Sequence, residues 1–130
     1  MRFSATLIPD VFVVYLDLHA DERGFFAEAF TSRRFAEQGL RSTIDTCSIS
    51  RSERAGTFRG FHYQLPPFTQ TKLIRCIRGR AYDIVVDMRP ASPTYGRHFT
   101  VELNDDNRTA IYVPEMVAQG WLALTDGAEI

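Results

Sequence analysis

Apolar and polar residues alternate with a period of two across most of the second half of the chain. The alternation is clear in residues 73–77, 82–88 and 99–103. Successive side chains of a strand point to opposite faces, so this period is typical of antiparallel sheets with one buried face. Turn-forming residues separate the segments: a glycine and an arginine at 79–80 favour a hairpin, 90–96 a longer connection and 104–107 a further turn. Many short strands of this kind predict an all-β sandwich or jelly roll.

The first half of the chain predicts two further strands and one short helix. Residues 11–16 are β-branched and aromatic on both faces, and 25–30 form a shorter strand after a polar loop at 17–24 that exposes His19. Ser32 is the expected helix cap, Phe35 its inward residue and Gly39 the residue that ends it.

Composition limits the function classes. The 130 residues suit one domain, residues 1–130, and 15 Lys and Arg against 16 Asp and Glu leave no broad charge for nucleic acid. Two cysteines without CxxC spacing, no signal-like leader and no apolar run of membrane length favour a cytoplasmic protein without a membrane partner.

Arg59 and His62 interrupt an otherwise apolar strand that a double proline ends at Pro66 and Pro67. Burying either side chain in a core strand without a partner would cost several kcal/mol. Two interpretations remain open from these residues alone. His62 is a satisfied core histidine and Arg59 a surface ion-pair residue, or both face a polar pocket in which His62 carries protons.

Three motifs resemble one known family. Arg-Gly-Phe-His-Tyr-Gln at 59–64, Gln-Thr-Lys-Leu-Ile-Arg-Cys-Ile-Arg-Gly at 70–79 and Tyr-Asp-Ile-Val-Val-Asp-Met-Arg at 82–89 resemble the dTDP-4-dehydrorhamnose 3,5-epimerase family of sugar-nucleotide cupins. The likeness runs from near Asp21 to Ile130. It implies a cupin-type double-stranded β-helix, or jelly roll, with one short helix.

The resemblance also implies a reaction. Such epimerases remove a proton from the carbon beside the ketone of a dTDP-4-keto-6-deoxy sugar and return it on the opposite face, in deoxysugar biosynthesis. His62 matches the base and Lys72 the cation that faces the enolate oxygen, where an electrostatic contribution is largest. We expect no cofactor, and no metal, because His19, His62 and His98 stand far apart with no His-x-His motif.

The same resemblance assigns ligand contacts. Arg59 matches an arginine that holds the nucleotide diphosphate, a role that suits the planar guanidinium. Arg23 and Glu28 match residues that reach the ligand from the neighbouring subunit, which implies a homodimer. Thr46 and Ser48 occupy further positions that touch the ligand.

The chain departs from the family pattern at several of these positions. Thr46 and Ser48 stand where glutamine and asparagine are common, Met116 where glycine is usual, and Gln119 where a ligand-contacting histidine is usual. Gln119 keeps hydrogen-bonding capacity but carries no charge. The position of the family's tyrosine general acid follows Ile130, so we expect the C-terminal part of the family domain to be absent from these residues.

The departures leave alternatives to an epimerase. One is a catalytically impaired sugar-nucleotide-binding homologue, and another is an enzyme that acts on a single centre, as a mono-epimerase or ketoisomerase. Asp83 is a candidate for the carboxylate that orients the base.

Overall fold

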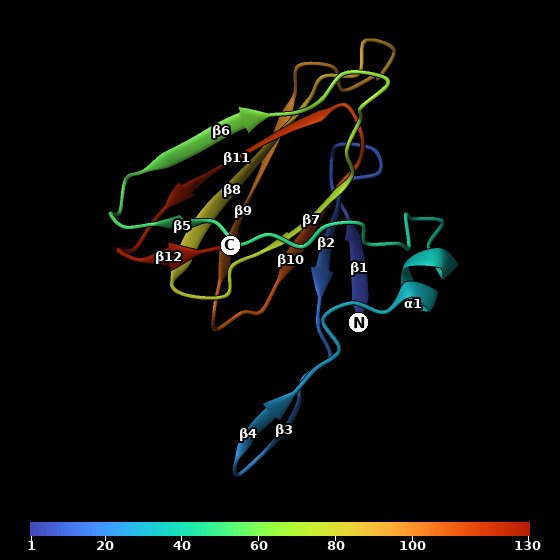
Figure 1. Cartoon of the computed structure of the whole chain (residues 1–130). Coiled ribbons are helices and arrows are strands. Elements are labelled where there is room, and N and C mark those ends of the chain that lie inside the picture. Colours follow the sequence, from blue (N-terminus) through green and yellow to red (C-terminus); the bar gives the residue numbers. More distant parts are fainter.

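Two four-stranded antiparallel sheets face each other in the computed structural model, which describes residues 1–130 (Figure 1). In spatial order, the first sheet contains β1 (Arg2–Ala5), β2 (Phe12–Tyr15), β10 (Ala110–Val113) and β7 (Lys72–Arg75). The second contains β6 (Phe58–His62), β11 (Val117–Ala123), β8 (Arg80–Asp87) and β9 (His98–Asn104). Two small sheets pair β5 (Arg51–Ser52) with β12 (Ala128–Glu129), and β3 (His19–Asp21) with β4 (Gly24–Phe26). With the single helix α1 (Ser32–Glu37), this confirms the predicted all-β, jelly-roll class.

The period of two in the sequence matches the burial of β8. Its residues at 81, 83, 85 and 87 are buried, and those between them are more exposed. Two inward side chains of β8, Ala81 and Val85, pack with Leu103 of β9, Ile111 of β10 and Trp121 of β11 in one core cluster between the sheets. Each large apolar side chain buried in this way contributes roughly 1.5–3 kcal/mol.

Strand β10 is buried on both faces because a second layer covers the first sheet. Ile111 lies in the core between the sheets, whereas Tyr112 packs with Phe35 of α1 in a second cluster. The Phe35 ring centroid lies 4.8 Å from that of Phe30 and 5.1 Å from that of Phe3. The inward role predicted for Phe35 is therefore confirmed.

The cap of the helix lies one residue earlier than predicted. Thr31 is the N-cap residue, with extended backbone and no side-chain capping bond, and Ser32 is already helical. Gly39 has φ = 70°, which confirms that a left-handed residue follows the helix.

Three local predictions were wrong. Residues 79–80 do not close a hairpin: β7 pairs with β10 and β8 pairs with β9 and β11, so this turn carries the chain from one sheet to the other. The polar loop predicted at 17–24 instead contains β3, which pairs with β4. The strand predicted at 25–30 is shorter and ends at Phe26.

The burial problem posed for Arg59 and His62 does not arise. Strand β6 lies at the edge of its sheet, and all five of its residues are exposed. The premise of a core strand was therefore wrong, since both side chains reach solvent.

No helix of this fold is long and apolar enough to cross a membrane.

Candidate active site

The two residues with predicted catalytic roles meet where the two sheets approach each other. His62 is the last residue of β6, and Lys72 is the first residue of β7 in the other sheet. The Lys72 Nζ donates a hydrogen bond of 3.1 Å to the backbone carbonyl of His62. His62 is exposed and Lys72 is half-buried, so the ammonium lies against the backbone of His62 and both residues reach solvent.

Gln119 belongs to the same cluster. It lies opposite His62 in the register of β11 and β6 and is 6% exposed. Its Nε2 donates a hydrogen bond of 2.7 Å to Oδ2 of Asp83, which is fully buried. The other carboxyl oxygen of Asp83, Oδ1, has no hydrogen-bond partner. The carboxylate considered as the orienting group for His62 is thus held by Gln119 instead.

Burial has the largest effect on the pKa values of Asp83 and Lys72. It raises the pKa of Asp83 to about 7, against the opposing effects of the Gln119 hydrogen bond and the Lys72 charge. Burial also lowers the pKa of Lys72, and the negative charge of Asp83 opposes that shift. The carboxylate and the ammonium therefore support each other's charged form across the cluster, although no contact within 4 Å makes them a salt bridge.

Two glycines allow β6 to lie against β11. A Cβ atom built on Gly60 would lie 2.5 Å from the Cα of Gly120, and Gly60 has φ = 143°, which L side chains rarely adopt. The pairing of the two strands shifts register between Gln119 and Trp121, beside this contact. The close approach places Arg59 and His62 of β6 over β11.

Arg59 is anchored from the neighbouring small sheet. Its Nε donates to Ser52 Oγ at 3.1 Å, and its Nη2 donates to the carbonyl of Arg51 at 2.9 Å. No carboxylate lies within 4 Å of its guanidinium, so its remaining N–H groups are available to an anionic ligand.

The other predicted ligand contacts lie outside this cluster. Thr46 and Ser48 are exposed in the segment before β5. Arg23 forms an exposed ion pair with Asp21 in the β3–β4 hairpin, and Glu28 accepts a hydrogen bond from Thr31 just beyond it. Figure 1 shows this hairpin projecting away from the two sheets, so one chain does not bring Arg23 to His62.

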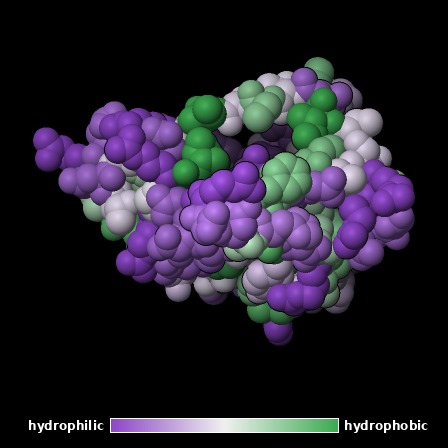
Figure 2. Space-filling model, turned by 90° about the horizontal axis from the view of Figure 1, so that it is seen from below, coloured by the Kyte–Doolittle hydropathy of each residue, from purple (hydrophilic) through white to green (hydrophobic).

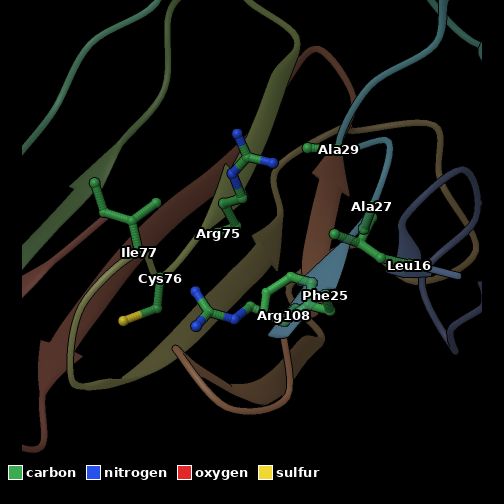
Figure 3. A pocket seen from close by; sticks show the side chains of 8 residues that line it. All are labelled: Leu16, Phe25, Ala27, Ala29, Arg75, Cys76, Ile77 and Arg108. Atoms are coloured by element: carbon green, nitrogen blue, oxygen red, sulfur yellow. The ribbon is translucent and has the colours of Figure 1, made fainter. Parts of the chain in front are cut away.

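Two hollows lie away from His62 and Lys72. One, of about 170 Å³, is shown in Figure 3 and lies where the base of the hairpin meets β7. In it the Arg108 guanidinium stacks 5.1 Å from the ring centroid of Phe25. The second, of about 40 Å³, includes Glu28.

The face seen from below in Figure 2 is mainly hydrophilic, with hydrophobic residues around a recess.

No group of three or more His, Cys, Asp or Glu side chains is arranged to hold a metal ion.

Comparison with known proteins identifies the family. The sequence model of dTDP-4-dehydrorhamnose 3,5-epimerase matches residues 5–130. The chain belongs to this family. It is 39% identical to the dTDP-4-dehydrorhamnose 3,5-epimerase of Shigella flexneri, over 99% of this chain and 71% of that protein. It spans 61–71% of the length of the first curated epimerases it matches.

Solved epimerase structures share the fold. The dTDP-4-dehydrorhamnose 3,5-epimerase of Elizabethkingia anophelis NUHP1 superposes with a TM-score of 0.95 at 34% identity, over 99% of this chain and 70% of that one. The dTDP-6-deoxy-D-glucose-3,5-epimerase of Legionella pneumophila Philadelphia 1, in complex with dTDP-4-keto-L-rhamnose, superposes with a TM-score of 0.91 at 33% identity, over 98% and 68% of the two chains. The cupin-like jelly roll implied by the sequence motifs is thereby confirmed.

The hydrogen bond between Asp83 and Gln119 was not predicted from the sequence. A signal was present, because each is a polar residue with apolar residues at the two neighbouring inward positions of its strand. Asp83 lies between Ala81 and Val85, and Gln119 between Val117 and Trp121. Two polar residues buried on adjacent strands need hydrogen-bond partners, and here Gln119 donates to Asp83.

Proposed function

We propose that this chain is an epimerase of a dTDP-linked 4-keto-6-deoxy sugar and acts in deoxysugar biosynthesis. The observation that carries the proposal is the hydrogen bond from Lys72 Nζ to the His62 carbonyl, which fixes the cation at the residue that carries the proposed base. Membership in the epimerase family supplies the substrate class. The homologous Legionella enzyme, in complex with dTDP-4-keto-L-rhamnose, supports the choice of a keto sugar.

The proposed reaction begins with a proton on the carbon beside the ketone. The exposed His62 imidazole takes that proton, and the electron pair moves onto the ketone oxygen to give an enolate. The Lys72 ammonium stabilises the new negative charge, and because it is already fixed near His62 it need not reorganise during the step. A proton from solvent then adds to the opposite face of the same carbon, and His62 releases the proton it took to solvent, so the centre is inverted and the enzyme is restored.

Substrate binding is proposed to use the edge of the second sheet. Arg59, held by Ser52 and the Arg51 carbonyl, presents its free N–H groups to the diphosphate. Thr46, Ser48 and Gln119 contact the rest of the ligand. Cys47 and Cys76 are free thiols, which is compatible with the cytoplasmic setting that we propose.

Hydrogen exchange tests the catalytic proposal. Incubation of the protein with the dTDP-4-keto-6-deoxy sugar in heavy water is expected to give deuterium uptake beside the ketone, measured by NMR and mass spectrometry. His62→Ala is expected to abolish uptake while dTDP binding, measured by calorimetry, persists. Deuterium at both carbons marks a double epimerase, and deuterium at one carbon marks a single-centre enzyme. Absence of uptake by the unaltered protein with dTDP binding intact would contradict the proposal.

One observation favours a second candidate, a binding protein with impaired catalysis. Gln119 is uncharged and its amide donates to Asp83, so this position offers the substrate no positive charge. This candidate predicts a calorimetric heat of dTDP binding that Arg59→Ala removes, together with no exchange of substrate hydrogen. Charge-matched Arg97→Ala, at an exposed position between β8 and β9, is the control and is expected to bind normally.

A further inference from the structure

Lys72 is the only lysine in the chain, since the other cationic side chains besides histidine are arginines. It is half-buried, and its single hydrogen bond goes to a neutral carbonyl. No carboxylate lies within 4 Å of its Nζ. Burial disfavours the charged form of this ammonium, so a negative charge elsewhere in the cluster is needed to offset that effect.

Asp83 is the carboxylate that meets this need. It is 0% exposed, and its Oδ2 accepts only the Gln119 amide while Oδ1 has no partner. The residues opposite it in the sheet, Val101 on β9 and Trp121 on β11, carry no charge. The amide of Gln119 fixes the carboxylate without neutralising it.

The other charged groups around Asp83 have partners of their own. On β8, Asp87 is bonded to Arg89, and Arg80 to Glu102. On β6, Arg59 is turned toward Ser52. His62 of β6 and Lys72 of β7 remain, and of these two it is the Lys72 charge that acts to lower the pKa of Asp83.

We propose that Asp83 is a positioning residue for Lys72: the Gln119 amide fixes a buried carboxylate in the cluster that contains the only lysine, and the negative charge of this carboxylate favours the ammonium form beside His62. The consequence for catalysis rests on the proposed function, because only in that reaction does the ammonium face an enolate. The electrostatic link between Asp83 and Lys72 does not rest on it and is measurable without substrate.

Because Asp83 and Lys72 are electrostatically linked, a signal from Lys72 reports the charge of Asp83. Because burial raises the pKa of Asp83 to about 7, this carboxyl loses its proton near neutral pH. Above that pH its negative charge supports the ammonium, and below it the support is absent. The Lys72 signal should therefore respond twice on titration, once when Asp83 ionises and again when Lys72 itself loses a proton.

NMR of protein labelled with [ε-¹³C]lysine tests the link, because a chain with one lysine gives one signal. The unaltered protein is expected to show an inflection near pH 7 in addition to that of Lys72. In Asp83→Asn the inflection near pH 7 should be lost and the Lys72 inflection should move to lower pH. Asp106→Asn, which removes an exposed carboxylate in the turn after β9, should leave both unchanged. Identical titration curves for Asp83→Asn and the unaltered protein would overturn the proposal.

Gln119→His provides an independent variant if Asp83→Asn does not fold. An imidazole bonded to Asp83 becomes positively charged as pH falls and then favours the ionised carboxylate. The Asp83 inflection in the lysine signal should consequently move to lower pH. An inflection that stays in place in Gln119→His would assign it to another group and overturn the proposal.

Deuterium exchange separates this inference from the proposed function. If the unaltered protein exchanges substrate hydrogen, Asp83→Asn should lower kcat with little change in KM, and the loss should grow toward alkaline pH where Lys72 loses its proton. If the unaltered protein shows no exchange, the proposed function fails, while the lysine titration still decides whether Asp83 supports Lys72.

Discussion

At the scale of single residues, Met116 is in a backbone conformation that normally favours glycine. Its φ is 60°, and it lies in the turn between β10 and β11, immediately before the strand that carries Gln119. The left-handed conformation costs a residue with a Cβ atom about 1–2 kcal/mol. The family pattern of glycine at this position thus has a physical reason, and this chain departs from it at a cost in stability.

A pair of substitutions at Met116 isolates that cost. Met116→Ala keeps the Cβ atom and loses only the rest of the side chain, whereas Met116→Gly also relieves the backbone. We expect the glycine variant to be more stable than the alanine variant by about 1 kcal/mol, the reverse of the usual order. Urea denaturation measures the difference, and an alanine variant as stable as the glycine variant would show that the turn carries no strain.

The Asp83 carboxyl predicts a pH dependence of stability. Its pKa is raised from 3.8 to about 7 in the folded chain, so folding favours the protonated form. The contribution is fully present below about pH 4 and is lost as pH rises through 7, which amounts to roughly 2–4 kcal/mol. Denaturation from pH 4 to 8 should show this decline for the unaltered protein and a flatter curve for Asp83→Asn. An equal decline in both would assign it to other groups.

At the scale of elements, the contact between β6 and β11 decides where the candidate site lies. Gly60 and Gly120 approach so closely that neither tolerates a Cβ atom without a shift. This approach places Arg59 and His62 at an exposed sheet edge, where both reach solvent. The function proposed for β6 therefore depends on two residues that have no side chain.

Gly60→Ala tests this dependence. The added Cβ would clash with the backbone of β11 and adopt an unfavourable φ, so we expect a loss of about 3 kcal/mol and weaker dTDP binding. Gly96→Ala is the matched control, because Gly96 has φ = 76° but no atom within 4 Å of the added Cβ. The free energy of unfolding of Gly96→Ala should fall by about 1 kcal/mol, and this variant should bind dTDP normally. If Gly60→Ala and Gly96→Ala lose equal dTDP affinity in calorimetry and equal stability in thermal denaturation, the contact between β6 and β11 is unimportant.

The connection from β8 to β9 is held by a second buried carboxylate that the sequence did not reveal. Asp87 accepts hydrogen bonds from Arg89, Ser92 and Thr94, all within the turn that follows it. Burial acts to raise the pKa of Asp87, but these hydrogen bonds outweigh it and hold the pKa below its usual value. Asp87 is thus a satisfied structural ion, whereas Asp83 on the same face of the strand has an oxygen without a partner.

At the scale of the whole molecule, the projecting β3–β4 hairpin leaves aromatic surface uncovered. Phe25 is 49% exposed and Phe26 is 69% exposed, beside Arg23. The homodimer expected from the sequence would provide a second copy of the chain to cover this surface, and Arg23 and Glu28 are the residues predicted to reach the other subunit's site. The dimer remains a prediction and has a direct test.

Mixing inactive variants tests whether sites are shared. If Arg23 serves the partner's site, dimers that combine His62→Ala with Arg23→Ala contain one intact site, and mixing should restore roughly a quarter of the exchange activity. His62→Ala mixed with Lys72→Ala is the control, because both residues lie in one subunit's cluster and no intact site forms. A lack of recovery in the first mixture, with mixed dimers verified by native mass spectrometry, would contradict a shared site.

The roles of His62 and Lys72 remain a prediction from the family resemblance, and the sequence by itself determined the strand class and the single helix with Phe35 inward. Local periodicity and residue chemistry carry that information. Only the tertiary structure decided that β6 is an exposed edge, that residues 79–80 lead from one sheet to the other, and that Gln119 binds Asp83. Strand partners are chosen by packing between segments distant in sequence, and a period of two shows which side chains share a face without showing which strand lies opposite.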